Sequence, residues 1–187
     1  MTTESTRLMA DRLNQALNAS LGPEDNPREV ARRLAPQIFA PDRIASLSAR
    51  PVAKKPRIRP SSGRKRANQA ISPWPPPPGF CAAIVSTVPQ YQGDSRPYAI
   101  GQTACAPPHA ASAVGNATTL NRFSGGWYQD QRNAVVYPTG NSFNATRSNN
   151  QCGNYYAIIF ARWAPAPGWS FPAGDSSGDV SSPTYYC

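Results

Sequence analysis

The sequence predicts a mainly β fold, in which a C-terminal antiparallel β-sandwich or barrel follows short N-terminal helices and an extended basic, Pro-rich arm. Phe39 is the only aromatic residue before Trp74, and eleven of the 13 glycines also follow that tryptophan. Turn signals recur about every ten residues after position 79, as a sandwich or barrel requires. Residues 1–72 hold fourteen of the 19 Lys and Arg residues, which indicates regions with different roles.

Residues 5–21 are predicted to form a helix. Ser5 or Thr6 is suited to cap its start, and Gly22-Pro23 supplies a stop. Apolar side chains recur at steps of three and four residues and make one stripe, formed by Met9, Leu13, Ala16, Leu17 and Leu21.

A second helix is predicted to begin with the sequence NPRE. Asn26 is suited to the N-cap, Pro27 to the first helical position, and Glu29 to a capping box, whereas Pro36 ends the helix near residue 34. Residues 41–50 fit one more helical turn. We interpret residues 1–49 as a docking segment that covers a neighbouring chain or the C-terminal domain. A tail that is disordered in isolation is the alternative interpretation.

Residues 50–78 have the composition of an arm that cannot order itself, because prolines and charges leave little apolar surface to bury. Four consecutive prolines, Pro75 to Pro78, predict a stiff polyproline spacer. Cationic side chains spaced along an extended chain suit contact with phosphates of DNA or RNA without reading base sequence. A bipartite nuclear-import signal and a solvated linker are the alternatives. The predicted nucleic-acid-binding residues are Arg50, Lys54, Lys55, Arg57, Arg59, Arg64, Lys65 and Arg66.

Residues 79–187 are predicted to form the all-β domain. FCAAIVSTV at 80–88 predicts one strand, and shorter candidates follow at 97–105 and 111–120. NYYAIIFARW at 154–163 is apolar on both faces, so we expect a strand buried on both sides. The last twenty or so residues carry Pro and Gly at intervals and predict an extended strap.

The four cysteines lie in the β region without a C-x-x-C pair, so their spacing does not support a zinc site. Buried thiols and disulfides both stay open, and the terminal position of one cysteine suits a bridge that staples the strap. The candidates are Cys81, Cys105, Cys152 and Cys187.

Aromatic side chains of the β region fit either a stacking platform for sugars or bases, or a core with inter-subunit contacts. Core and contact are favoured, because a domain poor in Leu needs rings to fill its interior. The interface candidates are Trp127, Tyr128, Trp163, Trp169, Tyr185 and Tyr186.

No catalytic residue, cofactor or metal ligand is predicted. His109 is the only histidine, and its neighbours in sequence include no acidic residue. The N-terminal stretch has no apolar core of a secretory signal, and no apolar run approaches the roughly 20 residues that span a bilayer. The sequons at Asn18, Asn116 and Asn144 are interpreted as chance matches.

The order of segments, with helices, a basic arm, a stiff spacer and a charge-poor β domain, resembles that of small viral coat and virion proteins. The resemblance implies a basic arm that contacts packaged genome and a β domain that builds the shell. In such proteins the basic residues often begin near the terminus, whereas here some fifty residues precede them. A cement, tail or fibre module anchored by its helices is therefore a second virion-type interpretation.

The sequence thus predicts a non-enzymatic structural protein of a virus particle, a capsid, cement or tail component located in the virion. Its predicted partners are copies of itself, other virion proteins, and DNA or RNA. Synthesis is expected in the host cytoplasm or nucleus. The alternatives are a cellular nucleic-acid-binding protein with a β partner-recognition module, and a β domain that binds glycans or a receptor.

Overall fold

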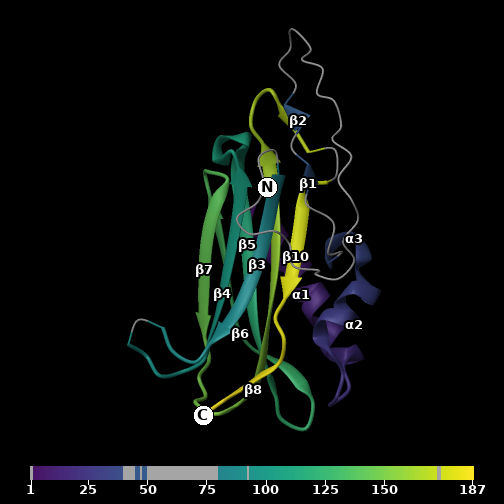
Figure 1. Cartoon of the computed structure of the whole chain (residues 1–187), viewed down its shortest axis with the longest axis vertical. Coiled ribbons are helices and arrows are strands. Elements are labelled where there is room, and N and C mark those ends of the chain that lie inside the picture. The colour runs from purple at the N-terminus through teal and green to yellow at the C-terminus, as the bar shows by residue number, and fades with distance from the viewer. Residues whose placement is uncertain (1, 40–44, 47, 50–79, 92, 172–173) are drawn as a thin grey trace, which may run out of the picture.

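The computed structural model describes residues 2–39, 45–46, 48–49, 80–91, 93–171 and 174–187, and it contains two packed antiparallel β-sheets with helices from the N-terminal part of the chain (Figure 1). The predicted mainly β fold is confirmed. The predicted arm, residues 50–78, lies outside the described residues. The helices are α1 (Thr3–Ser20), α2 (Pro27–Leu34), α3 (Pro36–Phe39) and the 3-10 turn η1 (Pro108–Ala110).

Sheet 1 has the strand order β1-β3-β4-β7, and sheet 2 has the order β10-β8-β5-β6 with β11 also paired to β8. A short ladder joins β2 to β9. The strands of sheet 1 are β1 (Ala45–Ser46), β3 (Phe80–Val88), β4 (Tyr98–Ala106) and β7 (Asn141–Arg147). The strands of sheet 2 are β5 (Ala111–Phe123), β6 (Trp127–Tyr137), β8 (Gly153–Pro165), β10 (Ser176–Val180) and β11 (Thr184–Tyr186). The remaining pair is β2 (Ser48–Ala49) and β9 (Trp169–Ser170).

Strand β8 is the centre of the molecule, and it is buried on both faces as its sequence predicts. Tyr155, Ile159 and Trp163 enter the core between the sheets, where they meet small side chains of sheet 1. Ile158 and Phe160 point to the opposite side of sheet 2 and pack beneath the helices. Because successive side chains of a strand alternate, one apolar run fills both layers.

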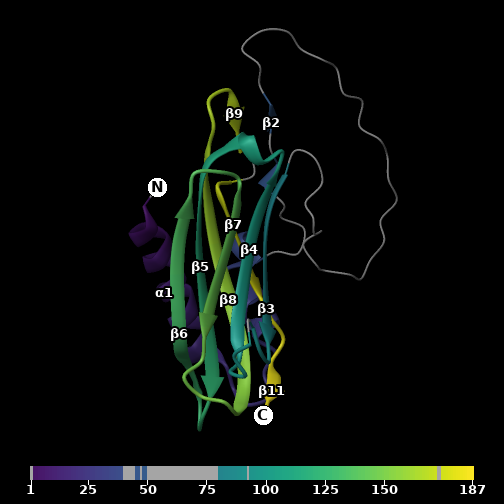
Figure 2. The same cartoon turned by 90° about the vertical axis from the view of Figure 1, so that its left-hand side faces the viewer.

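Helices α1, α2 and α3 cover the outer face of sheet 2, on the side away from β3 and β4 (Figure 2). Thr6, Ala10, Asn14 and Leu17 form the buried side of α1. The predicted apolar stripe is therefore wrong in part, because Met9 is 40% exposed. Polar and small residues of sheet 2 face the helix and determine which side of it is buried.

The ends of the helices follow the predicted caps in one case and differ in the other. Asn26 accepts a hydrogen bond from the backbone of Arg28, and Pro27 is the first residue of α2, as predicted. Helix α1 begins earlier than expected, because Thr2 is its cap in place of Ser5 or Thr6. The helical turn expected after Pro41 is also wrong, since residues 45–46 and 48–49 pair as strands.

Side chains join the two sheets along both sides of the sandwich. On one side, the Asn144 amide of β7 donates to the carbonyl of Asn133 on β6 at 2.8 Å. On the other side, the Asp179 carboxylate of β10 accepts from the backbone N–H of Val85 on β3 at 3.0 Å. Arg28 of α2 forms an ion pair with Asp179 and also bonds the carbonyl of Val180, so a helix secures this second side.

Candidate functional site

The structure places the residues predicted to form sites in three different settings. The basic set lies entirely outside the described residues, and it consists of Arg50, Lys54, Lys55, Arg57, Arg59, Arg64, Lys65 and Arg66. The cysteines pair as Cys81–Cys105, which joins β3 to β4, and Cys152–Cys187, which fastens the C-terminal strap. Of the alternatives open for these cysteines, the structure therefore has two disulfides.

The predicted aromatic candidates divide between the interior and the surface. Trp163 is 1% exposed in the core between the sheets, where Trp169 and Tyr186 pack against the same cluster. Trp127 packs beneath the helices against Tyr156, with ring centroids 4.9 Å apart. The two candidates on the surface are Tyr128, 39% exposed, and Tyr185, 64% exposed.

A shallow hollow of about 530 Å³ lies on sheet 1, at its β7 edge. We call it the β4–β7 hollow, and none of the described residues that line it is charged. Phe143 and Tyr137, 38% and 37% exposed, supply its rings. Side chains of the inter-sheet core alternate with those of the hollow along β4, so Gln102 and Ala104 point outward. The lining residues are Gln102, Thr103, Ala104, Tyr137, Asn141, Ser142 and Phe143.

An aromatic cluster continues this surface toward the β3–β4 loop. The ring of Tyr91 lies 5.5 Å from that of Tyr98 and 6.1 Å from that of Phe143, measured between centroids. Such tilted ring contacts add to the stabilisation from buried area. Together with the hollow, these rings make a broad uncharged surface that a partner of similar character can cover.

The charge at the end of this surface is neutralised locally. Asp94 bonds both Arg96, at 2.8 Å, and Arg147, at 2.6 Å. The hydrogen bonds from Arg96 hold the pKa of the Asp94 carboxyl well below its ordinary value. These three side chains lie at the rim, so the centre of the surface is left to apolar and amide groups.

Edge-to-edge pairing at β7 is hindered by side chains from β6. The Tyr137 hydroxyl donates to the carbonyl of Phe143 at 3.0 Å, and the Asn133 amide donates to the carbonyl of Ala145 at 3.4 Å. Acceptors that a neighbouring strand would need are therefore occupied. A partner on this side of the molecule is therefore expected to contact the face of sheet 1 and not the edge of β7.

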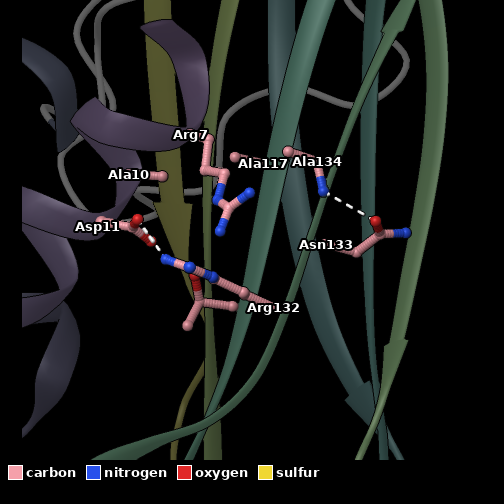
Figure 3. Close-up of a pocket in the computed structure, with 8 residues that line it drawn as sticks. Arg7, Ala10, Asp11, Ala117, Arg132, Asn133 and Ala134 are labelled. Carbon is pink, nitrogen blue, oxygen red and sulfur yellow. Dashed lines mark hydrogen bonds and ion pairs between the residues drawn. The ribbon is translucent and has the colours of Figure 1, made fainter. Parts of the chain in front are cut away.

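A second hollow, of about 210 Å³, lies between α1 and sheet 2 and is charged (Figure 3). Asp11 of α1 forms an ion pair with Arg132 of β6, and Arg7 extends its guanidinium into the same space. Among the described residues, no carboxylate lies within ion-pair distance of Arg7. Ala10, Ala117 and Ala134 leave the room that the arginines occupy. The ion pair fixes α1 on the sheet.

The described part of the chain contains no group of three or more His, Cys, Asp or Glu side chains that could hold a metal ion. One polar cluster is built around Ser148, which bonds Asp130 at 2.5 Å and Tyr155 at 3.1 Å. Burial raises the pKa of Tyr155, although its bond to Ser148 acts in the opposite direction. The cluster holds the segment after β7 against the core.

None of the helices described is long and apolar enough to cross a membrane.

Comparison of the chain with protein-family models, curated proteins and solved structures finds no match.

The residues of the β4–β7 hollow were not among the candidates that the sequence suggested. Burial alternates along residues 98–106 in the structure, but the sequence YAIGQTACA has small or apolar residues on both faces, so hydropathy does not mark which side chains point outward. The strand pairing Gln102↔Phe143 then brings residues distant in sequence to one surface. Composition highlights tryptophans, but the fold places three of them largely inside.

Proposed function

We propose that this chain is a non-enzymatic structural protein of a virus particle that self-associates through its β-sandwich. In this proposal the basic residues 50–66 contact nucleic acid or an acidic surface of the shell. The observation that carries the proposal is the charge-poor surface formed by the β4–β7 hollow and its aromatic cluster. The opposite face of the sandwich is covered by helices of the same chain.

The outer faces of the two sheets differ in what covers them, and this difference supports self-association. The central part of the outer face of sheet 2 is already covered, because α1, α2 and α3 bury Ile158 and Phe160 there. Sheet 1 carries exposed rings, Tyr137 and Phe143, in the area around its hollow. Uncharged surfaces with aromatic side chains are typical of the centre of protein–protein interfaces.

The separation of charge in the sequence supports the role of the arm. Residues 73–187 hold five basic and four acidic residues, so the β domain is nearly neutral. The excess positive charge belongs to the front of the chain. A nearly neutral domain can repeat side by side without strong repulsion, while many copies of a basic arm bind a polyanion with avidity.

A neutralised arm tests the nucleic-acid part of the proposal. Lys54, Lys55, Arg57, Arg59, Arg64, Lys65 and Arg66 are replaced together by Gln, and the 260/280 nm absorbance ratio of the purified protein is compared with that of the parent. We expect the variant to lose copurified nucleic acid. A matched control exchanges Lys and Arg at the same positions, which preserves the charge and should preserve binding.

The salt dependence of binding provides the quantitative form of this test. Counterion release predicts that the logarithm of the affinity falls with the logarithm of salt concentration, with a slope of up to about −7 for the parent. The neutralised variant should have a slope near zero. Equal slopes for the two proteins would exclude the arm as the nucleic-acid contact.

A further inference from the structure

We propose that copies of the chain join head to tail, with Tyr185 of one copy inserted into the β4–β7 hollow of the next. This inference rests on the proposed self-association and specifies its geometry. Tyr185 is the most exposed of the large hydrophobic side chains in the described part of the chain, at 64%. A ring in that position exposes apolar area that a hollow can bury.

The C-terminal strap holds Tyr185 in place. Its backbone pairs with Asn154 in the ladder between β11 and β8. The next residue, Tyr186, packs on the core and donates to Thr87 at 2.8 Å, and Cys187 is bonded to Cys152. Because its neighbours are fixed, Tyr185 can bind without much loss of conformational entropy.

The hollow has the chemistry that a tyrosine ring requires. Phe143, Tyr137 and Ala104 supply apolar contact, while the amides of Gln102 and Asn141 can bond a phenol hydroxyl. The described residues of the hollow carry no charge, so an entering ring does not strip water from an ion among them. An apolar ring with one polar end therefore matches an apolar hollow with polar groups.

Tyr185 lies near one end of the sandwich, whereas the hollow extends from the level of Ile159, in the middle of β8, toward the other end. Tyr185 pairs with β8 near the start of that strand. At the other end, Gly140 beside the hollow bonds Pro108 of η1. The same 3-10 turn bonds Ala166, just after the end of β8. Figure 2 shows β11 at the lower end of the sandwich. Measured along β8 from Asn154, the hollow therefore begins about 17 Å away and ends about 35 Å away, at ~3.3 Å per residue. The ring cannot reach the hollow of its own chain.

The two features also point in opposite directions. Tyr186 enters the core, so by alternation Tyr185 points away from the core on the sheet 2 side. The hollow opens on the outer face of sheet 1. A twofold pair would have to present both features on one shared surface, which this arrangement prevents. Repetition of a single head-to-tail contact instead produces a ring or an open chain.

Two variants with complementary defects test this geometry in the full-length chain. Tyr185→Ser removes the inserted ring, and Ala104→Trp fills the hollow. We expect each variant alone to have a contact weakened by about 30-fold or more, as for a central interface residue, and to be monomeric by sedimentation velocity. An equimolar mixture should form a dimer and nothing larger, because the first variant still offers a hollow and the second still offers a ring.

Controls separate loss of contact from loss of fold. Tyr185→Phe retains the ring and should assemble, and Ser86→Trp adds the same bulk to sheet 1 outside the hollow. If Ala104→Trp does not fold, Asn141→Trp fills the hollow from an exposed position of β7. Far-ultraviolet circular dichroism identifies folded variants.

The outcomes distinguish this inference from the function on which it rests. Assembly of Tyr185→Ser at parental concentrations would overturn the head-to-tail contact and leave self-association standing. Two monomeric variants that do not pair on mixing would also overturn it. A parent chain that is monomeric at every concentration would remove the proposed self-association and this inference together.

Discussion

Asn144 donates a hydrogen bond to the main-chain carbonyl of Asn133, and this 2.8 Å bond joins β7 to β6 although the two strands belong to different sheets. The same amide nitrogen lies 3.2 Å from the carbonyl of Asn116 on β5. Asn144 is 2% exposed and Asn116 is 0% exposed, so the carbonyl of Asn116 has no water as a ready substitute. Asn144 is therefore the buried member of the side-chain bonds that close this side of the sandwich, beside those of Tyr137 and Asn133.

Replacement of Asn144 by Ala should lower the free energy of unfolding by about 1–3 kcal/mol, because the buried carbonyl of Asn116 and the partly buried carbonyl of Asn133 lose their donor. Urea denaturation followed by tryptophan fluorescence measures the change. Asn144→Asp should be more harmful, since a carboxylate cannot donate and its charge would be buried. Asn141→Ala, at an exposed position of the same strand, is the control and should change stability by at most about 0.5 kcal/mol. Equal stabilities for all variants would contradict the role given to Asn144.

Asp179 and Asp94 should respond to pH with opposite signs. Burial raises the pKa of Asp179, although the Val85 N–H and Arg28 favour its charged form. The folded chain therefore keeps this proton to higher pH than the unfolded chain. Its contribution to stability falls as pH rises from the ordinary value of about 3.9 to the raised pKa. Unfolding of Asp179→Asn across pH 3–7 should lack this decline.

For Asp94 the bonds from Arg96 lower the pKa, so its stabilising contribution is present at neutral pH and is lost as pH falls through the lowered value. Asp94→Asn should therefore be less stable than the parent at neutral pH, and the difference should shrink in acid. For Asp94 the pH series is extended below pH 3, because its contribution is lost only between the ordinary pKa and the lowered one. Differences of the same sign for the two positions would refute this assignment.

The two disulfides should be reduced in a defined order. Cys187 is exposed, whereas Cys81 and Cys105 are 0% and 2% exposed in the core. Under native conditions a thiol reductant should open Cys152–Cys187 first, because access limits exchange. Alkylation and intact mass after increasing reduction times detect the order, with Cys81→Ser and Cys152→Ser variants to identify the bridges. Earlier labelling of Cys81 and Cys105 would contradict the structure.

Loss of either bridge should lower stability by about 3–4 kcal/mol in the chain-entropy description, given sequence separations of 24 and 35. Cys187→Ser has a further consequence. It releases the strap that holds Tyr185, so assembly should weaken even in protein that stays folded. Retained assembly would show that the strap needs no anchor.

Helix α1 should be released more easily when its bonds to sheet 2 are cut. The Tyr156 hydroxyl donates to the Asn18 side chain at 2.5 Å, and Asn18 also bonds Asn121 at 2.9 Å. Tyr156→Phe should destabilise the protein by about 1 kcal/mol and speed amide exchange in α1 more than in β8. Ser20→Ala, at an exposed position near the end of α1, is the control. Unchanged exchange in α1 would mean that this bond does not hold the helix.

Local signals in the sequence were sufficient for the fold class and for several elements. The apolar run at 154–163 became the central strand, and Asn26-Pro27 became a helix start, because period and capping act over a few residues. The buried face of α1 was not predictable in this way. Asn14, 1% exposed, faces sheet 2 because that face presents polar partners such as Gln129, which only the fold brings near.

The candidate site was harder to predict than the fold, for a related reason. Tyr91, Tyr98 and Phe143 come together through the pairing of β4 with β7 and through the loop that precedes β4. Sequence reasoning selected Trp163 as an interface residue, but Trp163 is the largest side chain fully buried in the core. Ring size is a guide to buried area, and the pairing of strands decides which ring is covered.

Light scattering coupled to size-exclusion chromatography of the full-length chain, over a range of concentrations in high salt, tests the central claim most directly. High salt removes nucleic acid, so any association that remains belongs to the protein. Self-association through the sandwich predicts species many times the chain mass of 20.1 kDa that grow with concentration and fall to that mass in Ala104→Trp. A parent chain that stays at 20.1 kDa throughout would contradict self-association through the sandwich.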